Sequence, residues 1–423
     1  MPIFYHYDAK IQKKKENVLF LEKKLLLLRK ICQMKRICFL IDSIFSIGGV
    51  QRVTAVIAKE LAKEYDVSIF TFDKPEKKDT SLYDLSEQGM HYQFFAYSDV
   101  AKIKGFLFKV HRAIYIILRS RAKWHSKIYA ITTFPSEQRN TILPALQAGK
   151  FDVIIGVHAT LAERLATLKK ELPNTKVIGW LHNSFNAIFG KDSQYIGANK
   201  KFHYIRQFRK LDEFVVLCHN DAHLFTQYDK EFTPTVIYNP LTLIPGKPSA
   251  GTSKRFLAVG RFSYQHKGFD LLIKAFHIFC QENHDWELDI VGEGDMEFEY
   301  KALIKEYHLE ERIMIHPFTN RIQNYYSNAQ IYVLSSRWEG MPLVLMEAMS
   351  HGLPIVTSDL PVCKEILGDF GIYFKNGDIN ELAQKLEEAT HIEWQKKSEQ
   401  ALEIAHRFEV EPIIQQWKEL IEK

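Results

Sequence analysis

The feature that most constrains this chain is a repeated alternation of short, continuous apolar runs with longer segments of helical periodicity. The first run, Ile37–Ile41, is followed by Gly48-Gly49 and then by apolar residues three and four apart from Val50 to Leu61. An uninterrupted apolar run is typical of a strand covered on both faces, and the three-and-four spacing marks one face of a helix. Their alternation predicts a parallel sheet with right-handed crossovers.

The alternation occurs twice, and residues 239–253, with three prolines and two glycines, separate the two occurrences. A chain of 423 residues also exceeds the size of one ordinary core. We therefore predict an α/β fold of two doubly wound, Rossmann-like domains, residues 34–238 and 254–408, with 239–253 as linker and a last helix, 409–423, that can pack back on the first domain. The expected strands are Ile37–Ile41, Val67–Phe72, Val153–Ile155, Val177–Trp180, Phe214–Leu217, Thr235–Tyr238, Phe256–Val259, Leu288–Val291, Ile313–Ile315, Ile331–Leu334, Ile355–Thr357 and Ile372–Phe374.

Positive charge is concentrated at the start of the chain. Residues 1–36 carry a net charge of +7, whereas the whole chain carries +5, so the remainder sums to −2. We expect residues 1–33 to be a basic extension that folding does not need, with Met34 as a candidate natural start. The apolar run Leu25–Leu28 is far shorter than the roughly 20 residues that cross a bilayer, and no signal-peptide cleavage pattern follows it. Five scattered cysteines indicate neither a disulfide framework nor a zinc site. These features predict a cytoplasmic protein.

Two cations follow the expected strand Phe256–Val259. Arg261 comes directly after Gly260, and Lys267 precedes Gly268. Ligands of doubly wound sheets bind at the carboxyl ends of the strands, and two fixed positive charges there can hold a diphosphate and stabilise it as it departs. Taken alone, the same two residues are equally compatible with a solvated loop.

Glu339 and Glu347 stand eight residues apart, on either side of an expected helix start near Pro342. Carboxylates in these places can accept hydrogen bonds from sugar hydroxyls, while the free amides of the helix start face an anion. A first-turn acid or an exposed helical residue would explain one glutamate or the other, but neither explains the whole string from 339 to 347.

Taken together, these motifs resemble glycosyltransferase family 4, a family of retaining enzymes with the GT-B fold that includes bacterial polysaccharide and lipid-linked glycan enzymes. Its pattern of Gly-Arg, Lys-Gly and Glu-x7-Glu is met by 260–261, 267–268 and 339–347, with support from 291–294 and 348–356. The resemblance implies two Rossmann-like domains facing a cleft. It also implies transfer of a hexose or N-acetylhexosamine from a nucleotide diphosphate sugar, with UDP as the favoured nucleotide, to a glycan acceptor.

The resemblance assigns roles to residues of the second domain. Arg261 and Lys267 should bind the donor diphosphate. Glu339 should contact hydroxyls of the transferred sugar, aided by backbone amides near Met341 and Leu343.

Further donor contacts are implied on both sides of the cleft. Glu347 should take the ribose hydroxyls, Gly292 belongs to a supporting motif, and the base should lie near Phe318. In the first domain, Gly49 belongs to the family's glycine loop, where small residues allow close approach of a ligand. His182 follows an expected strand and, by resemblance, should touch the donor sugar or orient the acceptor. With Arg261, Lys267 and Glu339 it completes the expected catalytic set.

The mechanism is inferred partly from motifs that do not occur. No convincing Asp-x-Asp is present to hold a metal against a diphosphate, so we expect no metal or other cofactor, with Arg261, Lys267 and the helix start neutralising the charge. The family retains anomeric configuration, and no covalent nucleophile stands out. A front-face, ion-pair-like substitution is the preferred mechanism.

Residues 101–127 contain eight lysines and arginines and no acid, interleaved with aromatic and aliphatic residues. A basic helix of this kind is typical of membrane-surface binding. An ordinary helix whose apolar side joins the core of the first domain would give the same pattern. With the basic start, the segment favours a lipid-linked, anionic acceptor and peripheral contact with the inner face of an anionic membrane.

The sequence fits other functions less well. Nucleic-acid binding lacks any accompanying motif, so no nucleic-acid partner is expected. A nicotinamide dehydrogenase would need a third glycine where Glu297 stands. A nucleotide-sugar epimerase of the same architecture would not obviously use the Glu339 and Glu347 pair. A non-catalytic partner subunit would have no need of all four of Arg261, Lys267, Glu339 and Glu347.

Overall fold

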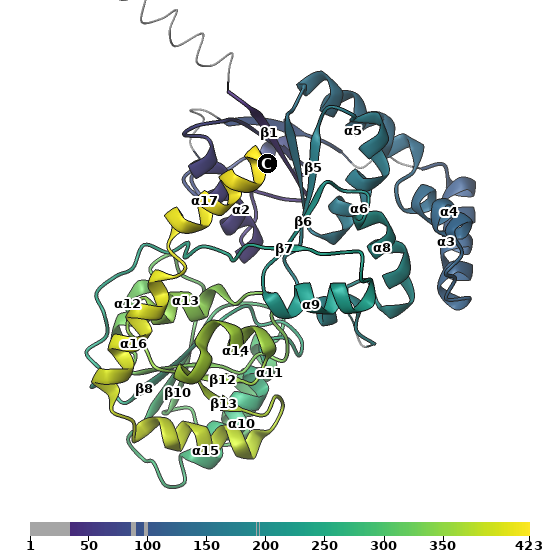
Figure 1. Cartoon of the computed structure of the whole chain (residues 1–423). Coiled ribbons are helices and arrows are strands. Elements are labelled where there is room, and N and C mark those ends of the chain that lie inside the picture. Colours follow the sequence, from purple (N-terminus) through teal and green to yellow (C-terminus); the bar gives the residue numbers. More distant parts are fainter. Residues whose placement is uncertain (1–33, 86–89, 97–99, 192, 194) are drawn as a thin grey trace, which may run out of the picture.

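The chain folds into two lobes, each a parallel β-sheet covered by helices (Figure 1). The computed structural model describes residues 34–85, 90–96, 100–191, 193 and 195–423. The basic extension expected at 1–33 lies outside these residues. None of the helices described is long and apolar enough to cross a membrane.

The N-terminal sheet has the strand order β3-β2-β1-β4-β5-β6-β7, and every neighbouring pair is parallel. Strand β1 lies inside the sheet, between β2 and β4, and is buried from Ile37 onward because helices cover both faces. The strands are β1 (Arg36–Ile41), β2 (Asp66–Thr71), β3 (Met90–Phe94), β4 (Val153–Val157), β5 (Lys176–Trp180), β6 (Glu213–Val216) and β7 (Thr235–Val236). The α-helices are α2 (Gly49–Leu61), α3 (Lys102–Ile117), α4 (Lys123–Thr133), α5 (Ser136–Gly149), α6 (Ala159–Leu168), α7 (Phe185–Phe189), α8 (Lys201–Phe208) and α9 (His219–Tyr228).

The C-terminal sheet has the order β10-β9-β8-β11-β12-β13 and is also parallel throughout. Chain order reverses between β8 and β11, and this is where a doubly wound sheet opens its ligand crevice. The strands are β8 (Arg255–Val259), β9 (Glu287–Val291), β10 (Ile313–His316), β11 (Ile331–Leu334), β12 (Ile355–Ser358) and β13 (Ile372–Phe374). The α-helices are α10 (Phe269–Phe279), α11 (Glu297–Glu306), α12 (Gln323–Asn328), α13 (Leu343–Met349), α14 (Pro361–Leu367), α15 (Ile379–Thr390) and α16 (Trp394–His406).

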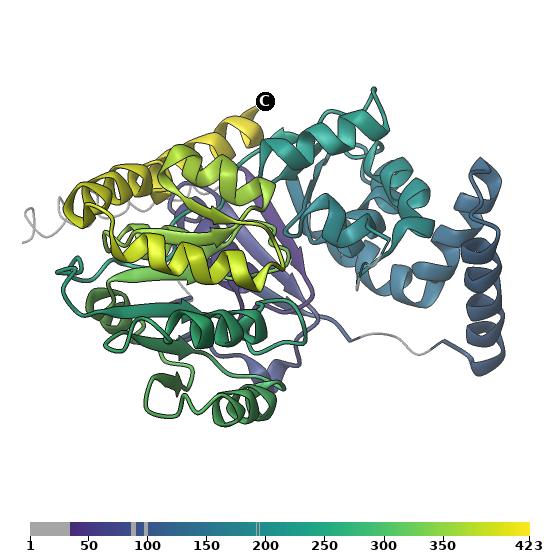
Figure 2. The ribbon, with the colours of Figure 1, turned by 90° about the horizontal axis from the view of Figure 1, so that it is seen from below.

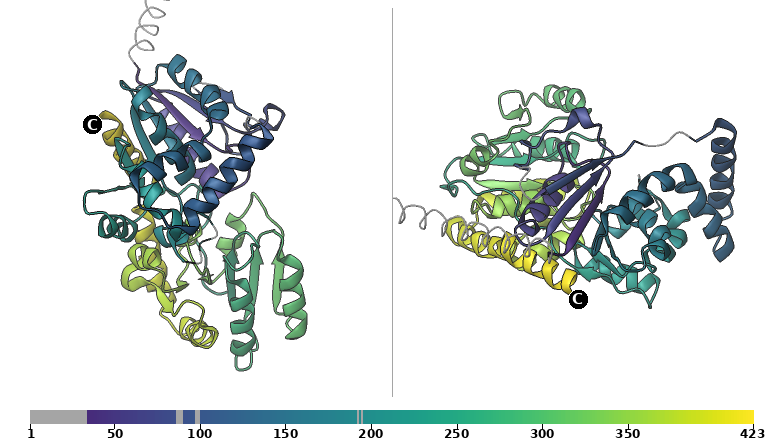
Figure 3. Two further views of the ribbon diagram at one scale, coloured as in Figure 1. Left: turned by 90° about the vertical axis from the view of Figure 1, so that its right-hand side faces the viewer. Right: turned by 90° about the horizontal axis from the view of Figure 1, so that it is seen from above.

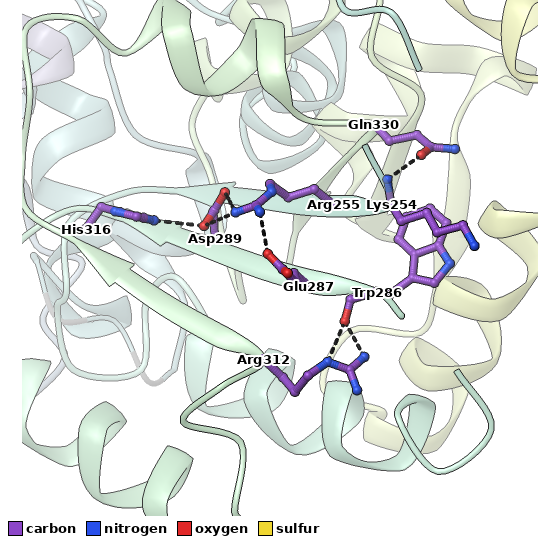
Figure 4. Close-up of polar contacts among 8 residues, drawn as sticks. All are labelled: Lys254, Arg255, Trp286, Glu287, Asp289, Arg312, His316 and Gln330. Atoms are coloured by element: carbon purple, nitrogen blue, oxygen red, sulfur yellow. Dashed lines mark hydrogen bonds and ion pairs between the residues drawn. The ribbon is translucent and has the colours of Figure 1, made fainter. Parts of the chain in front are cut away.

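A polar network joins three strands of the C-terminal sheet (Figure 4). Arg255 on β8 donates to both carboxylate oxygens of Asp289 on β9, at 2.9 and 3.1 Å, and also pairs with Glu287. The Nε2 atom of His316, at the end of β10, lies 2.8 Å from Oδ1 of Asp289. Because Asp289 is buried, these partners satisfy a carboxylate that would otherwise be costly. The network fixes the end of β10, where the loop carrying Phe318 begins.

The last helix, α17 (Val410–Glu422), leaves the C-terminal lobe and lies on the N-terminal one (Figures 1 and 3). Its Trp417 ring packs edge-on against Trp180 of β5, with ring centroids 4.8 Å apart. Lys35 donates to Glu422 at 2.6 Å, and Lys176 donates to a backbone carbonyl of the same helix. Residues 237–254, which form no helix or strand, connect the N-terminal lobe to the C-terminal one. Because α17 returns to the N-terminal lobe, the chain crosses between the lobes twice.

Two elements differ from the expectation. Strand β3 was not predicted, because Met90–Phe94 alternates buried and exposed residues, as an edge strand does, and lacks a continuous apolar run. The single basic helix expected within 101–127 is wrong, since the segment is divided between α3 and α4. The break falls at Arg119, whose φ of 45° lies in the left-handed region that ends a helix.

Candidate active site

The loops after β8 and β11 meet at the point where the C-terminal sheet changes direction. The two strands are neighbours, so their carboxyl ends lie side by side. Gly268, with φ 65°, starts α10, and a Cβ atom there would lie 2.0 Å from the carbonyl oxygen of Ser335. Only glycine permits this approach. As a result, Lys267 Nζ donates to Glu339 Oε1 at 2.6 Å across the two loops.

Glu339 is buried, and its contact with Lys267 keeps it charged. Burial raises the pKa of its carboxyl, but attraction to Lys267 and His266 and the hydrogen bond from Lys267 outweigh burial, so the pKa lies below its usual value. The His266 ring stacks on Trp338 with centroids 4.9 Å apart, and its Nε2 atom lies 2.9 Å from the Trp338 carbonyl oxygen. Burial lowers the pKa of His266. The loop therefore presents a fixed carboxylate with one ammonium group against it.

The N-terminal lobe closes against this loop pair through its own glycine-rich loop. Arg261 is exposed, and its Nη2 donates to the carbonyl oxygen of Ile47 at 2.9 Å. A Cβ atom on Gly49 would lie 3.3 Å from a methyl group of Leu343, the first residue of α13. The segment that carries Glu339 thus faces the start of α2.

A second interlobe contact brings His182 to the same place. A Cβ atom on Gly340 would lie 2.1 Å from the His182 carbonyl oxygen. Glycine at 340 therefore lets the loop after β5 touch the loop after β11. Arg261, Lys267, Glu339, Gly49, Leu343 and His182 are thereby gathered along one seam between the lobes.

His182 is buried and neutral at physiological pH. Burial, reinforced by the neighbouring His158, holds the pKa of His182 well below its usual value. Its ring lies 4.2 Å from that of Trp180 and 5.4 Å from that of His158, centroid to centroid. Among the described residues, none hydrogen-bonds its Nε2 atom, although that atom is out of contact with solvent. A buried nitrogen of this kind is uncommon and is free to bond a ligand.

Glu347 is buried on α13, and both of its carboxylate oxygens have partners. Oε1 pairs with Arg52 of α2, in the other lobe. Oε2 accepts a hydrogen bond from the Tyr326 hydroxyl at 2.9 Å. Ribose hydroxyls expected at Glu347 would therefore compete with Arg52.

The remaining expected donor contacts are placed differently. Gly292 follows β9, and a Cβ atom there would lie 1.9 Å from the Gly260 carbonyl oxygen, so glycine allows the loops after β8 and β9 to touch. Met341 is buried, with its sulfur 3.0 Å from the Asn239 backbone nitrogen. Phe318 is 46% exposed beyond β10, and β9 separates that strand from β8. Phe318 is the expected site residue that the structure does not join to the others.

A cavity of about 300 Å³ lies at the carboxyl ends of β1, β4 and β5 in the N-terminal lobe. Leu181 and Asn183, the chain neighbours of His182, line it, so it lies beside His182. Its polar lining comes from Asp42, His158, Thr160, Asn183 and Tyr195. His158 has φ 77°, unusual for a residue other than glycine, and burial lowers its pKa.

Sequence reasoning missed several of these features. Arg52, His266, Trp338 and His158 were given no roles, because their partners are distant in the chain. The position of Arg52 on the first turn of α2, directly after the glycine loop, was the one available signal. In the part of the chain that the structure describes, no three His, Cys, Asp or Glu side chains form a group able to hold a metal.

Comparisons with known proteins agree with this architecture. Residues 47–243 match a family model described as Glycosyltransferase Family 4, and residues 242–407 match one described as Glycosyl transferases group 1. An uncharacterized glycosyltransferase of Haemophilus influenzae is 28% identical over 399 residues, covering 92% of this chain and all of the relative.

Two further matches are a curated enzyme and a solved structure. The N-acetylgalactosamine-N,N'-diacetylbacillosaminyl-diphospho-undecaprenol 4-alpha-N-acetylgalactosaminyltransferase of Campylobacter jejuni is 32% identical over 136 residues, 31% of this chain and 36% of that protein. The crystal structure of Anabaena HepE in complex with UDP and glucose superposes with a TM-score of 0.68 at 19% identity, over 92% of this chain and all of that one. At that identity the structure supports the fold alone. The two matched models and the shared fold together identify the chain as a member of the family-4 type of glycosyltransferase, with the GT-B architecture.

Proposed function

We propose that this glycosyltransferase moves a hexose or N-acetylhexosamine from a nucleotide diphosphate sugar, with UDP the favoured nucleotide, to a lipid-linked glycan with retention of anomeric configuration. The observation that carries the proposal is the contact of Lys267 with buried Glu339 at the seam between the lobes. A fixed carboxylate suits sugar hydroxyls, and a fixed ammonium suits a phosphate.

On the donor side, Lys267 and Arg261 bind the diphosphate and Glu339 binds the transferred sugar. Arg261 now bonds the carbonyl of Ile47, a neutral acceptor that a phosphate oxygen readily replaces. The ribose hydroxyls take one oxygen of Glu347, and Arg52 releases it.

On the acceptor side, the cavity beside His182 receives the sugar that is to be extended. Neutral His182 offers its unbonded Nε2 to a sugar hydroxyl. The acceptor oxygen attacks the anomeric carbon on the face from which the phosphate leaves, and the acceptor proton passes to the departing phosphate oxygen. The negative charge of the leaving group is stabilised by Lys267 and Arg261, and no metal is needed.

In this proposal the acceptor lies at the cytoplasmic face of a membrane, and the enzyme takes part in surface polysaccharide or oligosaccharide synthesis. The Campylobacter relative supports this, because its name specifies a diphospho-undecaprenol substrate. The basic segment at 101–127 is compatible with an anionic surface of that kind.

A hydrolysis screen across UDP-, GDP- and ADP-sugars tests the donor assignment. We expect one UDP-sugar to be turned over, and we expect Lys267→Ala and Glu339→Ala each to abolish most of the turnover. Lys301→Ala is the matched control, since this exposed lysine pairs with Glu297 on the surface of α11. Equal turnover in all variants, or turnover that a chelator removes and magnesium restores, would contradict the proposal.

A further inference from the structure

Helix α3 exposes its aliphatic side to solvent. Seven large apolar residues recur at three- and four-residue spacing along α3 and at the residue that follows it, and they therefore share one face. Five of them are exposed by 59% or more. They are Ile103, Phe106, Leu107, Val110, Ile114, Ile117 and Leu118. In a helix that merely covers a core, this face would be the buried one.

The opposite face of α3, which is polar and aromatic, is packed against α4 and the start of α5. Tyr115 is fully buried, with its ring 4.4 Å from that of Tyr129. Arg112 donates to the Thr132 carbonyl oxygen at 3.0 Å, and Lys104 donates to Glu137 at 2.7 Å. Since these groups occupy the inner face, the helix cannot rotate its aliphatic side inward without breaking them.

Helix α4 has the same inverted arrangement. Trp124 is 64% exposed and Ile131 58%, on the side away from the lobe. On the buried side, Ser126 Oγ lies 2.9 Å from Nδ1 of His203, whose Nε2 lies 2.9 Å from a carboxylate oxygen of Glu163. All three polar residues are fully buried. This chain of hydrogen bonds attaches α4 to α8 and α6 and fixes which side faces outward.

Positive charge borders the exposed aliphatic face. Six cations of the pair and its connection are exposed, and residues 101–127 contain no acid. They are Lys102, Lys109, Arg119, Arg121, Lys123 and Lys127. Apolar side chains bordered by cations match the boundary between headgroups and acyl chains in an anionic bilayer.

We infer that α3 and α4 form a membrane-docking surface whose occupant is an anionic lipid bilayer. The aliphatic face enters the headgroup boundary and the cations contact lipid phosphates. Residues 1–33 are a poor occupant of this surface, because they are themselves strongly basic. A second copy of the chain is also a poor occupant, because its α3 and α4 would bring the same cations against the cations of the first copy. The pair lies at the outer edge of the N-terminal lobe, away from the C-terminal one (Figures 2 and 3). Docking there leaves the C-terminal lobe clear of the membrane.

This inference rests on the proposed lipid-linked acceptor, but binding can be measured without turnover. The full chain is sedimented with vesicles of phosphatidylcholine, alone or mixed with phosphatidylglycerol. We expect binding to the mixed vesicles only, weakening as salt rises. Lys109→Gln/Arg121→Gln/Lys127→Gln should weaken it by about a hundredfold. Lys301→Gln/Lys305→Gln/Lys396→Gln removes the same charge from the other lobe and should not weaken it.

The apolar face is tested in the same assay. Phe106→Ser/Ile117→Ser/Trp124→Ser should abolish binding, whereas Ile244→Ser/Phe298→Ser, at residues 85% and 81% exposed elsewhere, should not. Donor hydrolysis without vesicles should be unchanged in every variant, which separates loss of docking from loss of the proposed function. Wild-type binding by both surface variants would overturn the inference. The inference would also be overturned if the parent chain bound no vesicles and formed a dimer that the apolar variant converts to a monomer.

Discussion

The two lobes share one plan of parallel strands and covering helices, yet they assemble their functional groups differently. In the C-terminal lobe, Lys267 and Glu339 sit in loops after neighbouring strands, within short motifs. In the N-terminal lobe, the cavity beside His182 is lined from the ends of three strands and a later loop. The proposed donor diphosphate is common to many sugars, so a compact motif would suffice to bind it. The residues that line the N-terminal cavity are dispersed along the chain, so short motifs cannot describe them.

The largest effect should come from the C-terminal lobe. Lys267→Met is expected to lower kcat/KM about 100- to 1,000-fold, as does removal of one charge-stabilising group from an active site. If Lys267 and Glu339 act as a unit, adding Glu339→Gln to the Lys267→Met variant should lower kcat/KM by far less than another 100- to 1,000-fold. Steady-state kinetics of the two single variants and the double variant measure this. Multiplicative losses would show that the two loops act separately.

The contact between the lobes should have the next effect. Arg52→Gln leaves the buried carboxylate of Glu347 without its cation, so we expect a loss of about 3 kcal/mol in the free energy of unfolding. Urea denaturation measures it. Arg52→Gln combined with Glu347→Gln should recover part of the loss, because the uncompensated charge is gone. An unchanged midpoint in Arg52→Gln would mean that the lobes are not coupled through this pair.

His182 makes the N-terminal lobe sensitive to acid. The folded state holds its pKa well below the ordinary histidine value of about 6.5, so below that value the unfolded chain takes up a proton that the folded chain excludes. Stability should therefore fall as pH drops below about 6.5, by at most about 1.4 kcal/mol per pH unit from this residue, until the folded pKa is reached. His182→Gln should have a shallower acid slope in urea denaturation. An identical slope would assign the effect to other groups.

The smallest effect is expected at the exposed face of α3 and α4. Phe106→Ser/Ile117→Ser/Trp124→Ser should change the free energy of unfolding by no more than about 0.5 kcal/mol per site, because these side chains contact little of the lobe. Thermal unfolding of the parent and the variant gives the comparison. A much larger loss would mean that the face supports the fold after all.

Much of the C-terminal lobe could be predicted from the sequence. Its strands are continuous apolar runs, and Ile331–Leu334 and Ile372–Phe374 have the predicted bounds. The contact of Lys267 with Glu339 follows from the pairing of β8 with β11, although neither distance nor burial could be read from the motif.

The N-terminal lobe was less predictable because its decisive contacts are long-range. The packing of Tyr115 on Tyr129 decides that the aliphatic side of α3 faces outward, and periodicity alone cannot distinguish an inner from an outer face. Arg52 and Glu347 are nearly 300 residues apart in the chain, so no local pattern could pair them. The left-handed residue Arg119, which divides α3 from α4, carries no sequence signal such as glycine.

The return of α17 to the first lobe has a consequence for folding during synthesis. Domains generally fold as they emerge from the ribosome, the N-terminal one first. Here Trp180 of the N-terminal sheet is covered by Trp417, which is made more than two hundred residues later. The first lobe must therefore wait, with an aromatic side uncovered, until the second lobe has been translated. A nascent chain of this protein should need chaperone protection longest at the domain that is synthesised first.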